Sequence, residues 1–489
     1  MNLPRLLSAL ASLTLLAAAA RAQTNATWTG ATNSNWNFSG TNWTPMNIPG
    51  GTSNDTATFN AASGSNNITS TGFSLASLTF TSDALANTIT ASGSMNFFGA
   101  GIVNASAATQ TLVANSSLAF NNSSAAGSVA ITSNFTINFV GFSSAGSATI
   151  TNNGTASFSG SATAGSASIT NNSSLSFLFN ATAGSAAITN NDTVSFSINA
   201  SGGSAAVTNG ASGIVDFTNS SFFSSQSLGS LAGGGTVLMP YGGTLTVGSL
   251  NTNTTFSGVL DDANTGSNLT KVGSGTLTLT GANTYIGGTT VAAGTLSVNG
   301  SLADSIVTVA TGGTLSGSGT FGGATTVQSG GTLAPGNSPG LATFSSGLTL
   351  DSGSSTNFEI NGPGRGTTYD AIDVTGGTLT YGGTFNLSFG SLLANGTTLD
   401  LFGLTNPPAA TFFSSIVATG SYAGSFTNSG GDWTFTDGTQ VLTFSQSTGD
   451  LSFAASAVPE PSTYAALLGA AALVGVAVQR QRKKISVNL

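Results

Sequence analysis

Apolar and polar positions alternate with a fixed period through the middle of the chain. A glycine is followed four residues later by Ile or Val, and twelve residues later by Phe or Val. Successive glycines lie 19 residues apart, as do Gly127 and Gly146. A fixed period of about 20 residues is typical of a solenoid, whose units bury their apolar sides by stacking on one another. The glycines are Gly127, Gly146, Gly165, Gly184 and Gly203; the apolar sets are Ile131, Ile150, Ile169, Ile188 and Val207, and Phe139, Phe158, Phe177, Phe196 and Val215.

Within one repeat, apolar residues occur at every second position. Ala148 and Ile150 precede an Asn-Asn-Gly turn, and Ala156 and Phe158 follow it. Because side chains alternate between the two faces of a strand, this pattern predicts two strands with these four residues pointing inward. The same alternation points Ser147, Thr149 and Thr151 outward.

The turn asparagines are predicted to form a ladder. Parallel stacking of equivalent strands places Asn153, Asn172 and Asn191 above one another. Asn tolerates left-handed backbone, and its amide can hydrogen-bond to the next copy along such a stack. We expect each coil to rise by about 4.8 Å, the distance between hydrogen-bonded strands.

A second repeat family follows the first and has almost the same period. Gly-Thr-Leu recurs at Gly275, Gly294, Gly313 and Gly331, with spacings of 19, 19 and 18 residues. Different residues with one coil length predict a single continuous solenoid of about 19 residues per coil over residues 106–390. The inward candidates are Leu277, Leu279, Leu296, Val298, Leu315 and Leu333, with Val291, Val309 and Val327 on another face.

The segments on either side of the repeats are interpreted as β-rich caps. Residues 23–105 contain Trp28, Trp36 and Trp43 in Asn- and Gly-rich surroundings, and residues 391–456 contain strand-like runs without the period. Large aromatic side chains can close the open edge at the end of a solenoid. The alternative for the three tryptophans is stacking on sugar rings.

Both ends of the chain resemble export signals. Residues 1–22 have the positive start, apolar core and small-x-small site of a signal peptide, with Ala20 and Ala22 at the predicted signal peptidase site. In the tail, residues 457–489, a proline motif precedes an Ala- and Leu-rich run at 464–478 that predicts a marginal membrane-spanning helix. The motif is Val458, Pro459, Glu460 and Pro461, and the basic cluster after the run, which favours a cytoplasmic C-terminus, is Arg480, Arg482, Lys483 and Lys484.

The order of these tail elements resembles the PEP-CTERM sorting signal of exported bacterial proteins, with Pro459, Glu460 and Pro461 matching its tripeptide. The resemblance covers about 30 residues. It implies processing by an exosortase, in bacteria that usually make exopolysaccharide. The expected location is therefore the cell surface, outer envelope or extracellular matrix, with transient inner-membrane anchoring through residues 464–478. The alternative is a plain tail anchor.

Residues 230–390 resemble the autotransporter-associated β-strand repeat. The resemblance rests on the stretch from Lys271 to Gly281, on Gly294-Thr295-Leu296, and on the downstream segments 334–340 and 369–374. It implies a right-handed parallel β-helix at the cell surface or released from it. True autotransporters end in a membrane barrel, whereas this sequence ends in the sorting tail, so we do not expect self-transport.

The composition argues against most enzyme chemistry. The sequence has no His and no Cys, so it cannot form a Ser-His-Asp or Cys-His nucleophile system and lacks the usual zinc ligands. The remaining catalytic option is a carboxylate pair for glycoside hydrolysis or elimination, but Asp is also a routine turn residue. We expect neither a cofactor nor a metal site. The candidate pairs, each interpreted as a turn, are Asp370 and Asp373, Asp261 and Asp262, and Asp432 and Asp437.

The charge of the body excludes two classes of partner. Between residues 23 and 457 there are 15 acidic residues and two cations, Lys271 and Arg365, so the net charge is 2 minus 15, or −13. Nucleic acids and anionic lipid surfaces are bound through concentrated Lys and Arg. The sequence therefore predicts an all-β, non-enzymatic exported protein that presents Ser, Thr and Asn to extracellular polysaccharide. The alternatives are a glycan-active enzyme with paired Asp residues, and an adhesin or spacer that binds a protein.

Overall fold

The chain folds as an all-β, right-handed parallel solenoid of about 14 turns with about 21 residues per turn, and it contains one C-terminal helix. The computed structural model describes residues 22–38, 40–64, 66–220, 224–456 and 461–485, with backbone alone for 461–466 and 483–485. The chain divides into two compact units, residues 1–290 and 291–489, which are described separately. The predicted fold class is confirmed.

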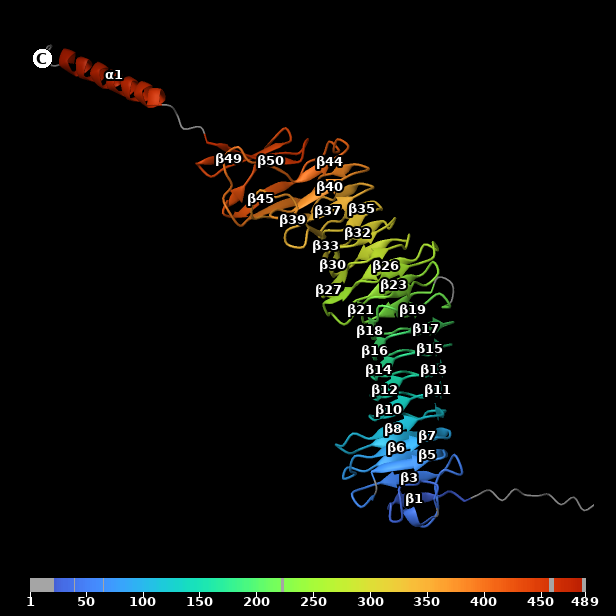
Figure 1. Cartoon of the computed structure of the whole chain (residues 1–489). Coiled ribbons are helices and arrows are strands. Elements are labelled where there is room, and N and C mark those ends of the chain that lie inside the picture. Colours follow the sequence, from blue (N-terminus) through green and yellow to red (C-terminus); the bar gives the residue numbers. More distant parts are fainter. Residues whose placement is uncertain (1–21, 39, 65, 221–223, 457–460, 486–489) are drawn as a thin grey trace, which may run out of the picture. The chain divides into compact units, whose positions relative to one another are not determined.

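Unit 1 is built from two long sheets and a shorter third one (Figure 1). Sheet 1 is parallel except for the β1–β2 pair, and sheets 2 and 3 are parallel. Sheet 1 contains β2 (Trp43–Thr44), β1 (Asn25–Trp28), β3 (Thr56–Phe59), β5 (Phe73–Phe80), β7 (Met95–Asn104), β9 (Ser117–Phe120), β11 (Thr136–Gly141), β13 (Thr155–Gly160), β15 (Ser174–Leu178), β17 (Thr193–Ser197), β19 (Ile214–Asp216), β22 (Thr236–Leu238) and β25 (Val259–Asp261). Sheet 2 contains β4 (Asn67–Ser70), β6 (Thr88–Ala91), β8 (Thr111–Ala114), β10 (Ala130–Ser133), β12 (Thr149–Asn152), β14 (Ser168–Asn171), β16 (Ala187–Asn190), β18 (Ala206–Asn209), β21 (Ser230–Gly233), β24 (Thr254–Phe256) and β27 (Thr276–Leu279). Sheet 3 contains β20 (Gln226–Leu228), β23 (Thr244–Val247) and β26 (Asn268–Lys271); a short 3-10 helix η1 (Gly40–Asn42), β28 (Ala282–Asn283) and β29 (Thr289–Val291), which includes the boundary between the units, complete the elements.

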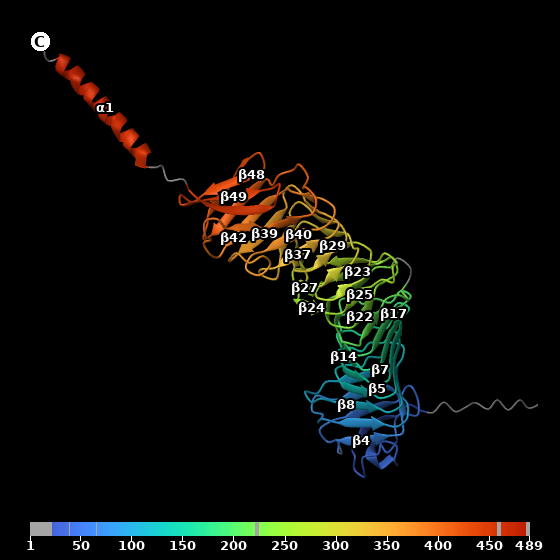
Figure 2. The same cartoon turned by 45° about the horizontal axis from the view of Figure 1, so that its top comes forward.

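The coils of the 19-residue repeat, called the ladder coils from here on, stack in perfect register. Strands β10, β12, β14, β16 and β18 pair so that each residue lies beside the one 19 positions later, as Ile131 does with Ile150. All the predicted inward residues of these coils are buried, and Ser147 and Thr149 are exposed as predicted. Figure 2 shows the two columns of strands from a second angle. The phenylalanines form a continuous stack of nearly parallel rings whose successive centroids lie 4.5 to 5.0 Å apart: Phe97, Phe120, Phe139, Phe158, Phe177, Phe196 and Phe217.

The prediction that Val215 belongs to the column of phenylalanines is wrong. Val215 was expected to follow Phe196, but it pairs with Val194 instead, and Phe217 stacks on Phe196. The reason is that this coil is two residues longer than the coils before it, since Thr193 pairs with Ile214, 21 positions later. Val215 remains buried.

The fixed period of 19 residues holds for the ladder and not for the whole solenoid. Other coils are longer: Thr236 pairs with Val259, 23 positions later, and in unit 2 Ser355 pairs with Thr384, 29 positions later. The mean of about 21 residues per turn corrects the predicted value. The two repeat families do meet in unit 1, where sheet 2 runs from β18 through β21 and β24 to β27, the first Gly-Thr-Leu copy.

A column of asparagines lies inside the ladder. Asn152, Asn171, Asn190 and Asn209 are at most 1% exposed. Each of the first three donates its side-chain N–H to the side-chain oxygen of the next at 2.8 Å. Buried polar groups are costly unless they are hydrogen-bonded, so this column stabilises one register of stacking. The sequence does not reveal this column, because the first Asn of each Asn-Asn turn looks no different from the second.

The three N-terminal tryptophans form a buried cluster. Trp28 and Trp36 are 0% exposed and Trp43 is 1% exposed. Trp43 crosses Trp28 and Trp36 edge to face, with centroids 5.0 and 4.6 Å away, and all three rings lie about 6 Å from that of Phe59. They close the first coil of unit 1, as predicted for a cap. No ring face of these residues is left for a sugar.

Unit 2 continues the parallel pattern and ends in an antiparallel sheet. Sheet 4 contains β30 (Gly294–Val298), β33 (Gly313–Gly317), β36 (Thr332–Pro335), β39 (Ser355–Ile360), β42 (Thr384–Phe389) and β45 (Ser415–Gly420), with β46 (Gly424–Ser425) antiparallel to β45. Sheet 5 contains β32 (Val307–Val309), β35 (Thr325–Val327), β38 (Leu348–Leu350) and β41 (Leu379–Thr380), and sheet 6 contains β31 (Ser301–Leu302), β34 (Thr320–Phe321), β37 (Leu341–Phe344), β40 (Ala371–Val374) and β44 (Phe402–Leu404). Sheet 7 has the order β43 (Thr398–Asp400), β50 (Asp450–Ala455), β49 (Gln440–Ser445), β48 (Asp432–Thr436) and β47 (Thr427–Ser429). Every predicted inward residue of the Gly-Thr-Leu family is buried.

The tail contains a single helix, α1 (Pro461–Ile485). Across the described part of the chain, no helix is both long and apolar enough to cross a membrane. The predicted span at residues 464–478 is therefore not confirmed. It has 15 residues, which at about 1.5 Å per residue reach about 22 Å, less than the hydrocarbon thickness of about 30 Å.

Candidate functional site

The outer face of sheet 2 carries a column of threonines. Parallel register places Thr132, Thr151, Thr170, Thr189 and Thr208 side by side on consecutive strands. Thr189 and Thr208 are exposed to solvent, and the other three are partly exposed. The neighbouring outward column has Ala, Thr, Ser, Ala and Ala, so this face of the ladder strands has no charge. It offers hydroxyl groups at the strand spacing of about 4.8 Å.

The predicted asparagine ladder runs along the exposed turn beside this face. Asn153 donates its amide N–H to the side-chain oxygen of Asn134 at 2.9 Å, Asn172 donates to Asn153 at 2.9 Å, and Asn191 donates to Asn172 at 2.7 Å. Asn134 continues the series by donating to Asn115 at 2.8 Å. A primary amide has two N–H groups, and each bond along the ladder uses one. The ladder therefore holds its amides in a fixed, repeated orientation at the surface.

Asp261 and Asp262 form a turn, as predicted. Asp262 is buried and accepts backbone N–H bonds from Asn264, Gly266 and Ser267 at 2.8 to 2.9 Å. Asp261 accepts one from Ala263 at 3.0 Å. The Asp262 carboxylate is occupied by the backbone that it orders, which is the usual use of Asp in a turn.

Asp370 and Asp373 serve different parts of the structure. Asp370 is 2% exposed and accepts N–H bonds from the backbone of Gly340 at 2.8 Å and of Glu359 at 2.7 Å. Asp373 instead forms an ion pair with Arg365 at 2.7 Å. Three positions separate the two residues along an extended segment, so their side chains point to opposite sides. They do not form a catalytic pair.

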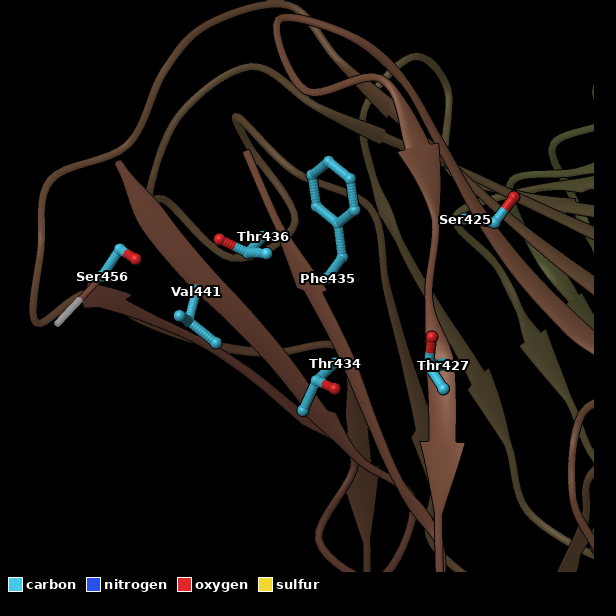
Figure 3. A pocket seen from close by; sticks show the side chains of 7 residues that line it. All are labelled: Ser425, Thr427, Thr434, Phe435, Thr436, Val441 and Ser456. Carbon is cyan, nitrogen blue, oxygen red and sulfur yellow. The ribbon is translucent and has the colours of Figure 1, made fainter. Parts of the chain in front are cut away.

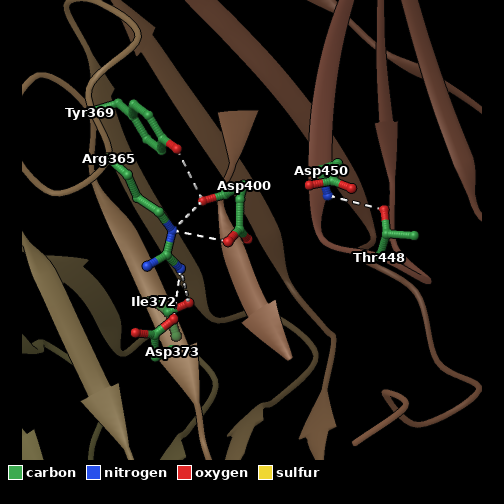
Figure 4. A network of polar contacts seen from close by, with 7 residues as sticks. All are labelled: Arg365, Tyr369, Ile372, Asp373, Asp400, Thr448 and Asp450. Atoms are coloured by element: carbon green, nitrogen blue, oxygen red, sulfur yellow. Dashed lines mark hydrogen bonds and ion pairs between the residues drawn. The ribbon is translucent and has the colours of Figure 1, made fainter. Parts of the chain in front are cut away.

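Arg365 is held by two carboxylates (Figure 4). Besides Asp373, it pairs with Asp400 at 3.1 Å, and it donates to the backbone oxygen of Asp400 at 2.9 Å. Burial alone lowers the pKa of Arg365, but the hydrogen bond that it donates to Asp373 and the charge of Asp400 raise it overall. Burial raises the pKa of Asp400, and Arg365 opposes that shift. This network joins the loop before β40 to β43.

A cavity of about 340 Å³ contains a carboxylate pair that the sequence analysis missed, Glu359 and Asp370. Glu359 is exposed and accepts a hydrogen bond from the Ser338 hydroxyl at 2.6 Å. Burial raises the pKa of Asp370 to about 6, although its two backbone hydrogen bonds act in the other direction. Because both Asp370 oxygens bind backbone N–H groups, this side chain fastens the 334–340 loop to β39. Eleven positions separate the two acids, and no local motif signals their meeting.

Asp432 and Asp437 are separated by the end of β48. Asp437 caps the following turn, accepting N–H bonds from Thr439 and Gln440 at 2.7 Å each. The Gln440 bond is the largest of the contacts that lower the pKa of Asp437. Asp432 instead lines a cavity of about 280 Å³ beside Phe412, and Asp437 is not among the residues that line it. Thus none of the three predicted pairs places two carboxylates in a shared cavity of the described chain.

The two cations of the body serve the fold. Lys271 is 1% exposed and donates to the backbone oxygens of Val272 and Gly273 at 2.8 and 3.0 Å. Its burial lowers the pKa of its ammonium group. Arg365 is occupied by its carboxylates. In the part of the chain that the structure describes, no three acidic side chains gather at one place that could hold a metal ion.

Most of the predicted sorting residues lie outside the described chain. Val458, Pro459 and Glu460 are not described, nor is Ala20. Pro461 begins α1, and Arg480 and Arg482 lie exposed on it. Lys483 and Lys484 belong to the same helix, with backbone alone described, and Ala22 is exposed before β1.

Comparison with known families supports the repeat resemblance. A family model described as Passenger-associated-transport-repeat matches residues 269–298 and 313–334. These segments contain the Gly-Thr-Leu copies at Gly275, Gly294, Gly313 and Gly331, and they lie inside the predicted range of 230–390. No curated protein sequence matches the chain significantly. The matched repeats and the β-solenoid fit an autotransporter-type passenger.

Proposed function

We propose that this protein is a non-enzymatic component of the cell surface or extracellular matrix that associates with extracellular polysaccharide. The observation that carries this proposal is the ladder face, which is the outer face of strands β10 to β18 with the adjoining turn. There a threonine column and an asparagine ladder repeat, with the exposed Asp192 as the one acidic residue beside the asparagines. Hydroxyl and amide groups donate and accept hydrogen bonds, as sugar hydroxyls do. Single contacts of this kind are weak, and a rigid array engages a repeating polymer by multivalency.

The location at the cell surface is supported by the passenger-type repeats and the solenoid. The non-enzymatic role is supported by the carboxylates: Asp262 and Asp437 order turns, Asp370 fastens a loop and Asp373 pairs with Arg365. A glycan-active enzyme requires two carboxyl groups on either side of one bond, with one acting as acid. The paired carboxylates expected from the sequence do not provide this.

Export and sorting form the second part of the proposal. Signal peptidase removes residues 1–22, and an exosortase-type enzyme recognises Pro459, Glu460 and Pro461. The tail holds the protein at the inner membrane until that step, with the basic residues after position 479 on the cytoplasmic side. The support for this part is the order of motif, apolar run and basic cluster in the sequence.

The decisive experiment is purification of the native protein from the cell envelope, followed by monosaccharide analysis. We expect glycan to accompany the protein and to be released when the polysaccharide is digested. A protein free of sugar would refute the association. Incubation of the purified protein with a panel of glycans is expected to yield no cleavage products, and cleavage would refute the non-enzymatic role.

A second candidate, an adhesin that binds a protein, is favoured by exposed apolar residues near one corner of the ladder coils. Phe142 is 74% exposed, Phe179 52% and Ile198 44%. Phe179 and Ile198 are one coil apart, and both have positive φ values of 62° and 61°. Such a conformation is uncommon for bulky residues and strained for a β-branched one, and exposed apolar patches mark interaction sites. Substitution of both by Asn, followed by cell-adhesion assays, tests this candidate.

A further inference from the structure

The outer face of sheet 7 carries hydroxyl groups in a row. Thr427 pairs with Thr434, Thr434 pairs with Thr443, and Thr443 pairs with Ser452 across four consecutive strands. Directly paired residues of a sheet project to the same side. The other side of β48, β49 and β50 is largely buried, with Trp433 paired to Phe444, whereas β47 is exposed on both sides. The sheet is therefore apolar toward the core and hydroxyl-rich toward solvent.

An open cavity of about 650 Å³ lies at the edge of this face (Figure 3). Thr427, Thr434 and Thr436 line it, together with Ser425 and Ser456 from the strand ends on either side. Phe435 contributes an aromatic ring, and no charged side chain lines the cavity. The volume lies within the range of about 300 to 1,000 Å³ that is typical of ligand pockets.

The Phe435 ring is fixed in place. It packs on Phe426 with centroids 5.6 Å apart, and it lies directly against Gly424. A side chain at Gly424 would collide with the ring edge, so the glycine lets the ring pack closely against β46. Phe435 is half-buried and lines the cavity from the side of β48 opposite to Thr434 and Thr436. A preorganised wall of this kind lowers the entropy cost of binding.

We infer that this cavity, the cap groove, binds a short segment of a neutral polysaccharide. Ser and Thr hydroxyls both donate and accept hydrogen bonds, which matches the hydroxyls around a sugar ring. An aromatic face, which carries partial negative charge, packs against the C–H face of such a ring. The absence of lining cations disfavours anionic glycans and phosphates, and the lining hydroxyls disfavour lipids. The inference rests on the proposed association with polysaccharide and assigns it a second site, separate from the ladder.

The test compares two matched pairs of substitutions in the full chain. Thr434→Val with Thr436→Val removes two hydroxyls from the cap groove without changing shape or charge, and both positions are exposed on a strand that tolerates Val. Thr149→Val with Thr151→Val makes the same chemical change on the ladder face. Unchanged thermal unfolding verifies that both variants are folded. A Phe435→Leu variant then examines the aromatic wall separately.

Binding is measured by retardation in native gels containing dextran, hydroxyethylcellulose or galactomannan, with anionic alginate as the charged comparison. We expect at least one neutral polymer to retard the wild-type chain, with at least tenfold weaker retardation for the cap-groove variant and little change for the ladder variant. Phe435→Leu is expected to weaken retardation as well.

Three results overturn the inference. They are no retardation by any neutral polymer, equal retardation of the wild-type chain and the cap-groove variant, and stronger retardation by alginate than by the neutral polymers. If the ladder variant alone loses binding, the cap groove is excluded while the proposed association stands. If the native protein carries no glycan on purification, the proposed association itself fails, whichever way the gels turn out.

Discussion

The side-chain amide of Asn171 donates a hydrogen bond to the side-chain oxygen of Asn190 at 2.8 Å, one coil away, inside the solenoid. The two N–H groups of the same nitrogen are shared between that oxygen and the backbone oxygens of Ser173 at 2.8 Å and Thr193 at 2.9 Å. Its oxygen accepts from Asn152. One buried amide thus joins three successive coils, which makes the inner column a determinant of stability and the outer ladder a feature of the surface.

Replacement of Asn171 by Ala is therefore expected to lower the free energy of unfolding by about 2 to 4 kcal/mol, because it leaves several buried partners unsatisfied. Replacement of the adjacent Asn172, whose amide is exposed, is expected to cost less than about 1 kcal/mol. Urea unfolding followed by circular dichroism measures both. Equal costs for the two neighbours would contradict the assignment of the inner column.

The phenylalanine stack gives a second prediction. Phe158 lies between Phe139 and Phe177 with centroids 4.5 and 4.9 Å away and is 1% exposed. Phe158→Ala is expected to cost about 3 to 5 kcal/mol, since the ring is lost and a cavity remains. Phe142→Ala, at a position 74% exposed, is the control and is expected to change stability by less than about 0.5 kcal/mol. A small effect at Phe158 would indicate that the neighbouring coils collapse into the gap.

Asp370 predicts a dependence of stability on pH. Its folded-state pKa of about 6 lies above the ordinary aspartate pKa of 3.8, so the folded state holds the proton more tightly. Its stabilising contribution is therefore fully present below about pH 4 and is lost as pH rises toward 6, by about 3 kcal/mol. Asp370→Asn cannot titrate, so the wild type should lose stability relative to this variant over that range.

Thermal or urea unfolding between pH 3.5 and 7.5 checks this prediction. Asp304→Asn, which removes an exposed carboxylate, is the control for the change in net charge. Parallel curves for the wild type and Asp370→Asn would show that the carboxyl group titrates alike in the folded and unfolded chains. The pKa of Asp370 sets this pH range. Other acidic residues also titrate and affect the stability of each variant, so the quantity to compare is the difference in stability between the wild type and Asp370→Asn.

The sorting proposal predicts that the tail decides location. Deletion of residues 457–489 is expected to move the protein from the surface or matrix into the medium or periplasm. Deletion of residues 486–489, which lie beyond the basic cluster, is the control and should leave the location unchanged. Cell fractionation measures both, and mass spectrometry of the surface protein reads its C-terminus. An intact Leu489 on surface protein would refute the processing step.

Much of the ladder can be read from the sequence because its coils are identical in length. Period-two alternation within each coil determines which face is buried, and the period of 19 residues aligns Ile131 with Ile150 and Asn153 with Asn172. These features depend on local geometry, since a strand alternates its side chains whatever its neighbours are. For the same reason, burial of the Gly-Thr-Leu residues follows directly from their spacing.

The tertiary structure decided what depends on contacts between distant residues. It separated the inner asparagine Asn152 from its exposed neighbour Asn153, and it moved Val215 out of the phenylalanine column because one coil is longer. It also buried the tryptophans, brought Glu359 to Asp370, and formed the cap groove around Phe435. The sequence alone determined the repeating architecture and the character of its surface, because both follow from periodicity. Which polar groups meet, and how deeply each is buried, depends on coil lengths and loop paths that no local pattern encodes.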